Sequence, residues 1–289
     1  MTAYRTVDVN GVEVFYREAG DPAAQTLLLL HGFPTSSTQY QGLIDRLADR
    51  FHLVAPDYPG FGYTKPLEGT TTFERLAEIL DGFVDAVGLH RYAMYVFDFG
   101  SPVGFRLATR HPERVDALII QNGNAYEAGI GPNLVGLAAY WEDRQAAEPA
   151  VRGFLQLDAT RSQYVEGVAD PERVNPDLWT LDQHFLDRPG RDQVMLDLIY
   201  DYTSNVALYP TWQAYLREHR PPTLITWGAN DQYFIADGAR AYLADVPDVE
   251  LHLLDTGHFA LVTHVDEIAE LIAAFHAKHA AGSMASART

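Results

Sequence analysis

The feature that most constrains the fold of this chain is an alternation of short apolar runs with helical patterns. The runs rarely alternate polar with apolar residues, which is typical of strands covered on both faces. They occupy residues 26–30, 51–55, 92–97, 115–120, 223–227 and 249–254. Helical patterns occupy residues 40–47, 73–87, 102–109, 239–243 and 268–279. This order predicts an α/β fold, with a mostly parallel, twisted sheet flanked by helices.

Two departures from the alternation define the expected domains. Residues 6–16 alternate polar and apolar side chains around Asn10-Gly11, which predicts an antiparallel hairpin. From about residue 122 to residue 220 the alternation stops, and the spacing of apolar residues suggests short helices. We expect a core of residues 1–122 and 220–279, an inserted helical lid of residues 123–219, and a disordered tail of residues 280–289.

Composition excludes several classes of function. The 289 residues contain no cysteine, which rules out disulfides, thiolate metal sites and a cysteine nucleophile. A net charge of -18 disfavours nucleic acid and anionic surfaces, so we expect a small neutral substrate. No apolar run approaches the ~20 residues that span a bilayer, and the N-terminus shows no secretory signal. We therefore expect a cytoplasmic monomer or homodimer with no membrane partner.

The segment of residues 95–112, YVFDFGSPVGFRLATRHP, indicates a reactive site. An apolar strand runs into Asp98, and Phe99, Gly100 and a helix follow at once. Such a sharp strand-to-helix turn needs small residues near the reactive one and lifts its side chain above the sheet. Gly100 is small, whereas Val96 stands where a second small residue is usual. A carboxylate here is already ionised at neutral pH and is suited to attack saturated carbon, which forms an ester.

Cleavage of that ester requires a base and a group that orients the base. His258 and Asp231 each follow a predicted strand, so both are expected beside Asp98 at the carboxyl edge of the sheet. The backbone N–H groups of Phe33 and Phe99 are expected to stabilise the oxyanion that forms when water attacks the ester. No pair of histidines shows metal-ligand spacing with supporting carboxylates, and we expect neither a metal nor a cofactor.

Several motifs together resemble one known family. HGFPTSS (residues 31–37), APDYPGFG (55–62), the DFG turn at Asp98, WGANDQYF (227–234) and TGHFAL (256–261) are similar to the α/β-hydrolase superfamily. The resemblance extends over nearly the whole chain and is to the branch of epoxide hydrolases and haloalkane dehalogenases. It implies an α/β-hydrolase fold, an aspartate nucleophile and a catalytic triad of Asp98, His258 and Asp231.

Within that branch, the group that stabilises the leaving atom separates the two activities. Dehalogenases usually hold the halide with a Trp after the nucleophile, and with an Asn in the first loop or a second Trp in the lid. The two core positions here are Phe99 and Phe33, whose side chains carry no N–H donor. Trp141 or Trp179 would compensate in part. Epoxide hydrolases use lid tyrosines, and the resemblance implies Tyr202, in LIYDYTSN (198–205), with Tyr140, in AAYWEDR (138–144), as its partner.

Simpler interpretations of these residues remain. Asp98 would serve as a helix N-cap, Ser101 would be an esterase nucleophile, Asp231 would be a surface turn residue, and the two lid tyrosines would be packing residues. Epoxide hydrolysis through an ester on Asp98 is the function we expect. Haloalkane dehalogenation by the same nucleophile is one alternative, and a non-hydrolytic binding or cyclising protein on the same fold is the other.

Overall fold

The computed structural model describes residues 1–286, and side chains up to residue 279. Within that range eight strands form one sheet in the order β1-β2-β4-β3-β5-β6-β7-β8. The strands are β1 (Ala3–Val9), β2 (Val12–Ala19), β3 (Thr26–Leu30), β4 (His52–Pro56), β5 (Tyr92–Phe97), β6 (Val115–Gln121), β7 (Thr223–Gly228) and β8 (Glu250–Leu254). β2 is antiparallel to both its neighbours, and every other pair is parallel. The expected α/β-hydrolase fold with a mostly parallel sheet is confirmed.

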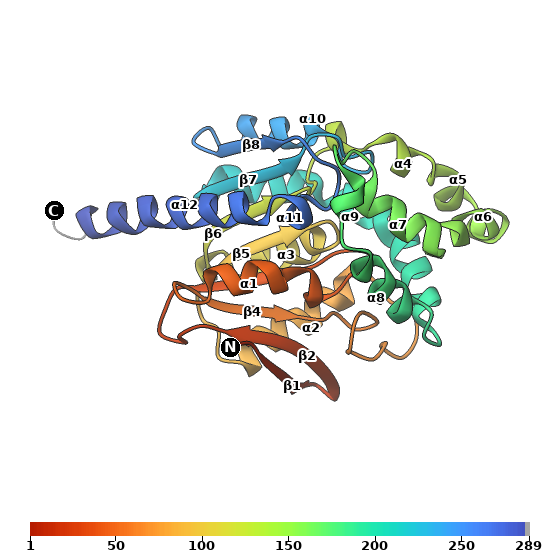
Figure 1. Cartoon of the computed structure of the whole chain (residues 1–289), viewed down its shortest axis with the longest axis horizontal. Helices are drawn as coiled ribbons and strands as arrows, with labels where there is room; N and C mark the ends of the chain where they lie inside the picture. Colours follow the sequence, from red (N-terminus) through yellow and green to blue (C-terminus); the bar gives the residue numbers. More distant parts are fainter. Residues whose placement is uncertain (287–289) are drawn as a thin grey trace.

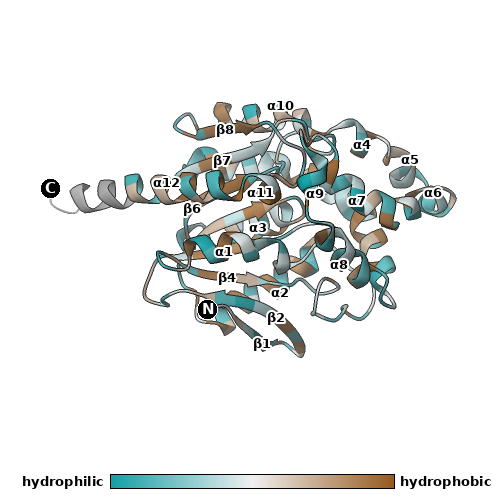
Figure 2. Cartoon of the chain, viewed as in Figure 1, coloured by the Kyte–Doolittle hydropathy of each residue, from teal (hydrophilic) through white to brown (hydrophobic). Residues whose placement is uncertain are grey.

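Alternate residues of the central strands pack on opposite faces of the sheet. In β3, Leu28 and Leu30 join one apolar cluster with helices α2 (Phe73–Ala86) and α3 (Gly100–Arg110). Leu27 and Leu29 join another with α1 (Gln41–Leu47) and α12 (Val265–Ser286). In Figure 2, hydrophobic and hydrophilic residues alternate along the coloured part of α12, as expected of a helix with one side on the sheet. Burial of both faces explains why the strand sequences are continuously apolar.

Helices between β6 and β7 gather at one end of the sheet (Figure 1). They are α4 (Pro132–Val135), α5 (Ala138–Glu142), α6 (Arg144–Val151), α7 (Leu157–Val165), α8 (Pro176–Leu186) and α9 (Arg191–His219). The last of these has 29 residues, so the expectation of short helices is wrong there. Its periodicity is obscured because polar residues of α9 are also buried. The Asp197 and Asp201 carboxylates accept hydrogen bonds from the Thr71 and Phe73 N–H groups, at 3.0 and 2.8 Å.

The expected tail needs a correction. Helix α12 continues to Ser286, so residues 280–286 are helical rather than disordered, and residues 287–289 lie outside the described residues. Three of the seven residues 280–286 are alanine, which has the highest helix propensity and favours the extension. Within the described part of the chain, none of the helices has the length and apolar character needed to cross a bilayer.

The turn from β5 into α3 has little spare room. A Cβ added to Gly100 would lie 2.1 Å from the backbone oxygen of Leu30, so a side chain there is excluded. The room that Val96 needs comes from the facing helix, because a Cβ at Gly104 would lie 2.7 Å from the Val96 Cγ1 atom. Gly104 in α3 thus leaves room for Val96, which stands at a position where a small residue is usual.

The Gly100→Ala substitution is expected to lower the free energy of unfolding by about 3 kcal/mol, because the backbone of β3 must move away. Gly153→Ala is the matched control, since a Cβ there meets nothing within 4 Å. Its effect should stay within about 0.5 kcal/mol. Urea unfolding followed by circular dichroism measures both, and equal effects of the two substitutions would contradict the proposed close contact.

Candidate active site

Asp98 stands at the turn between β5 and α3 in a strained conformation. Its φ is 49°, in the left-handed region that non-glycine residues seldom adopt. The neighbouring loop comes so close that a Cβ at Gly32 would lie 2.3 Å from Asp98 Oδ1. Helix α3 has no side-chain N-cap hydrogen bond, so the interpretation of Asp98 as a cap is wrong. Ser101 is fully buried within α3 and is not among the residues that line the cavity beside Asp98.

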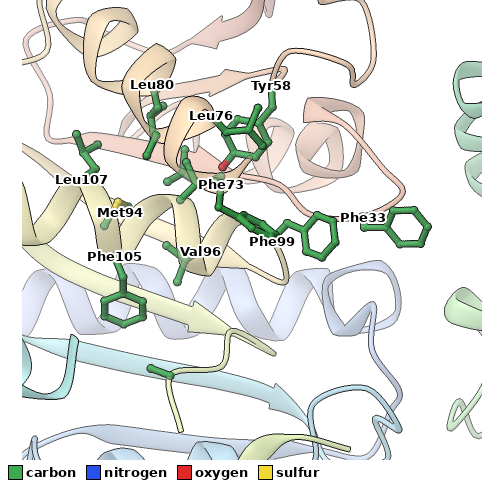
Figure 3. Close-up of a cluster of buried hydrophobic side chains, with 14 of the residues drawn as sticks. Phe33, Tyr58, Phe73, Leu76, Leu80, Met94, Val96, Phe99, Phe105 and Leu107 are labelled. Carbon is green, nitrogen blue, oxygen red and sulfur yellow. The ribbon is translucent and has the colours of Figure 1, made fainter. Parts of the chain in front are cut away.

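The carboxylate of Asp98 is held from two sides. The Phe33 N–H group donates to Oδ1 at 2.5 Å, and the Phe99 N–H group also donates to this carboxylate. The other oxygen, Oδ2, lies 3.8 Å from His258 Nε2. Figure 3 shows Phe33 and Phe99 side by side, with ring centroids 5.8 Å apart. The two backbone donors expected from the sequence therefore both reach this carboxylate.

His258 is joined to Asp231 by a short hydrogen bond. The His258 Nδ1 atom donates to Asp231 Oδ2 at 2.7 Å. Asn122 Nδ2 donates to the same oxygen at 2.8 Å, and the Tyr233 N–H group donates to Oδ1 at 2.7 Å. Asp231 is 2% exposed, so the interpretation as a surface turn residue is wrong. The structure brings Asp98, His258 and Asp231 together in one buried row.

Burial and charge together set the pKa values in this row. Burial raises the pKa of Asp98 to about 6, against the lowering effects of His258 and the two backbone donors. Burial by itself lowers the pKa of His258, but the charge and hydrogen bond of Asp231, aided by Asp98, outweigh it and raise the pKa above its ordinary value. The ionised form of Asp98 and the protonated form of His258 therefore stabilise each other.

A small cavity of about 40 Å³ lies over these residues. Its lining combines the core loops with the lid. The lining residues are Phe33, Asp98, Phe99, Leu134, Leu137, Phe154, Gln163, Ile199, Tyr202, Tyr233, Phe234 and His258. Most of them are apolar or aromatic, which suits a neutral ligand.

Tyr202 is the lid tyrosine that reaches the cavity. It is 3% exposed, and its ring centroid lies 6.3 Å from that of Phe99. Its hydroxyl lies 3.3 Å from the hydroxyl of Tyr209, which accepts a hydrogen bond from Asn124 Nδ2 at 3.1 Å. Tyr209 can therefore donate to the Tyr202 oxygen, which leaves the Tyr202 hydrogen free to point into the cavity.

Tyr140 and Trp141 are not where the sequence predicted, since neither lines the cavity. The Tyr140 hydroxyl donates to the Leu196 carbonyl at 3.2 Å. Trp141 stacks behind Tyr202, and its indole N–H donates to the Ile199 carbonyl at 2.8 Å. Both polar groups are used within the lid, and the structure brings neither residue to the cavity.

Sequence reasoning missed Asn122, Tyr233 and Gln163. Asn122 directly follows β6, and a polar residue at the carboxyl end of a parallel strand was a usable signal. Tyr233 lies in the same motif as Asp231, but its backbone rather than its side chain orients the carboxylate. Gln163 lies within α7, and no local pattern marks it. Among the described residues, no group of three or more His, Asp or Glu side chains is placed to hold a metal.

Comparison with known proteins agrees with the fold. A family model for the alpha/beta hydrolase fold matches residues 25–265, so the chain belongs to the α/β-hydrolase family. It is 44% identical to an uncharacterized hydrolase of Saccharomyces cerevisiae, over 93% of this chain and 95% of that protein. It is 36% identical to epoxide hydrolase A of Mycobacterium tuberculosis, over 39% of this chain and 36% of that one.

A solved structure shares the fold at lower identity. The crystal structure of an ancestral haloalkane dehalogenase superposes with a TM-score of 0.81 at 21% identity, covering 96% of this chain and 99% of the other. At that identity the likeness concerns the fold alone.

The Asp231→Asn substitution is expected to move the pKa of His258 below its ordinary value of about 6.5. Burial would still oppose the charged imidazole, while the negative charge that stabilises it would be lost. NMR titration of the histidine ring measures this shift. Asp255→Asn is the control. Asp255 is exposed in the loop that carries His258, and its substitution should leave the His258 titration unchanged. Identical His258 titrations in the two variants would disprove the role of Asp231.

Proposed function

We propose that the protein is a hydrolase that opens epoxides through a covalent ester on Asp98. The observation that carries the proposal is the position of this carboxylate. An aspartate stands where the turn lifts a reactive side chain, with Oδ1 held by a backbone donor at 2.5 Å and Oδ2 3.8 Å from His258. A carboxylate that is held by one oxygen offers the other for attack on saturated carbon.

The first step forms the ester. Asp98 Oδ2 attacks a ring carbon of the epoxide, and the bond between that carbon and the ring oxygen breaks. The developing alkoxide takes the hydroxyl proton of Tyr202, which lies in the same cavity. An alkoxide is much more basic than a phenolate, so this transfer is favourable even though burial raises the pKa of Tyr202 well above its usual range. Tyr202 regains a proton when His258 loses one.

The second step cleaves the ester. Esterification removes the negative charge of Asp98, which had helped to keep His258 protonated, and His258 can then act as a neutral base. Nε2 takes a proton from water, and the hydroxide adds to the Asp98 carboxyl carbon. The oxyanion that forms on Oδ1 accepts from the Phe33 and Phe99 N–H groups. The bond from the carboxyl carbon to the alkyl oxygen breaks, His258 protonates that oxygen, and the diol leaves.

The surroundings favour an epoxide over a haloalkane. Phe33 and Phe99 have no side-chain N–H to hold a halide. The indole N–H of Trp141 already donates to the Ile199 carbonyl. Trp179 does not line the cavity and lies beside Tyr164, with ring centroids 6.1 Å apart. The Tyr202 hydroxyl suits an oxygen leaving group.

Intact-mass spectrometry of a His258→Gln variant tests this proposal. Without the base the ester should persist, so incubation with epoxides is expected to add the whole mass of the epoxide to Asp98. The Asp98→Asn variant, incubated in parallel, should gain nothing. A mass increase equal to an alkyl group without its halogen, obtained with haloalkanes, would establish dehalogenation instead. Binding of epoxides by folded protein with no adduct in any case would favour the non-hydrolytic alternative.

The pH dependence of epoxide turnover gives a second test. A raised pKa means that Asp98 becomes protonated, and loses its nucleophilic form, at higher pH than an ordinary carboxyl group. We expect kcat/KM to fall about tenfold per pH unit below pH 6, because the pKa of Asp98 is about 6. Initial rates between pH 4.5 and 8 with a fixed epoxide measure it. An unchanged kcat/KM down to pH 4.5 would refute a raised pKa for the nucleophile.

A further inference from the structure

Gln163 places an unpaired amide in the wall of the reaction cavity. The residue belongs to α7, is 2% exposed and lines the cavity together with Asp98, Tyr202 and His258. Its Nε2 atom is buried and has no hydrogen-bond partner among the described residues. A buried amide without a partner is unfavourable, and polar groups in protein interiors are nearly always paired. The cavity offers the place where a partner can bind.

The helix that carries Gln163 is fixed on both sides of it. Thr160 Oγ1 donates to Gln183 Oε1 of α8 at 2.7 Å, and the Tyr164 hydroxyl donates to Asp182 of the same helix. Tyr164 also stacks on Phe259, the residue after His258, with ring centroids 3.9 Å apart. These contacts hold α7 against both the lid and the loop of His258. The amide is therefore presented by a rigid element rather than by a mobile loop.

Few other polar side chains of the lid face the cavity. Leu134, Leu137, Phe154 and Ile199 supply apolar wall. Tyr233 and His258 also line the cavity, but they belong to the core rather than to the lid. Among the described lid residues that line the cavity, the side-chain donors left for a bound molecule are the hydroxyl of Tyr202 and the amide of Gln163. The expected second tyrosine, Tyr140, has its hydroxyl bound to Leu196.

We propose that Gln163 is the second hydrogen-bond donor to the epoxide oxygen, beside Tyr202. This inference rests on the proposed function. As Asp98 Oδ2 bonds to the ring carbon and the carbon–oxygen bond breaks, negative charge grows on the leaving oxygen. Tyr202 supplies the proton, whereas Gln163 donates a hydrogen bond and keeps its own proton, because an amide is too weak an acid to transfer it. Gln163 thus acts in ring opening and has no part in cleavage of the ester.

Replacement of Gln163 by methionine tests the role, because methionine keeps the length of the side chain and removes the donor. The probes are styrene oxide, cyclohexene oxide and 1,2-epoxyhexane, in which the ring oxygen is the sole polar atom. In the His258→Gln background, Gln163→Met is expected to slow ester formation about 10- to 100-fold. Rapid-quench mass spectrometry measures the rate of ester formation. With His258 present, decay of the preformed ester should change less than twofold.

Gln183→Met is the structural comparison. Gln183 donates to the Leu155 carbonyl at 3.1 Å and to Asp187 at 2.7 Å, so its loss should lower the melting temperature. Gln163→Met removes no hydrogen bond and should leave the melting temperature unchanged or higher. The inference is overturned if Gln163→Met forms the ester at the unsubstituted rate, or if it lowers the melting temperature and slows both steps equally. No adduct from any epoxide when Gln163 is intact would overturn the proposed function itself.

Discussion

The tight turn at Asp98 is the constraint on which the rest of the site depends. A residue with φ of 49° is held there because the backbone of β3 and its loop come within contact distance, with glycines at positions 32 and 100. The same approach brings the Phe33 N–H group to 2.5 Å from the carboxylate. Strain, backbone packing and the oxyanion donors are therefore one arrangement, and a change to any part of it disturbs the others.

Burial then makes the charges of Asp98, His258 and Asp231 depend on the contacts around each side chain. Asp231 is surrounded by donors from His258, Asn122 and Tyr233, which stabilise its negative charge. Asp98 has fewer compensating contacts and a raised pKa. His258 lies between them, so its protonation depends on the charge of both carboxylates. Conversion of Asp98 into a neutral ester would lower the pKa of His258, and the proposed second step requires a neutral His258. Electrostatics would thus link the two half-reactions.

The lid helices provide part of the reaction chamber as well as its cover. Asp197 and Asp201 of helix α9 accept hydrogen bonds from the backbone at the start of α2. The same helix places Tyr202 in the wall of the cavity. Helix α7 is fixed to α8 and to the loop of His258, and it carries Gln163. In the proposed ring opening, the apolar wall between these two polar groups would exclude water from the developing charge, where a hydrogen bond is worth more than in solvent. Under the proposed function, the lid would therefore decide most of the substrate choice.

The sequence by itself determined the sheet, the site of Asp98 and the grouping of Asp98, His258 and Asp231, because parallel strands bring the residues at their carboxyl ends to one edge. Tertiary structure alone decided which lid residues face the cavity. Helical spacing shows which residues share a face, but the rotation of a helix is set by distant partners, and so Tyr140 turned away while Gln163 turned inward. The length of α9 was hidden because two of its polar residues, Asp197 and Asp201, are paired with the core and interrupt its apolar periodicity.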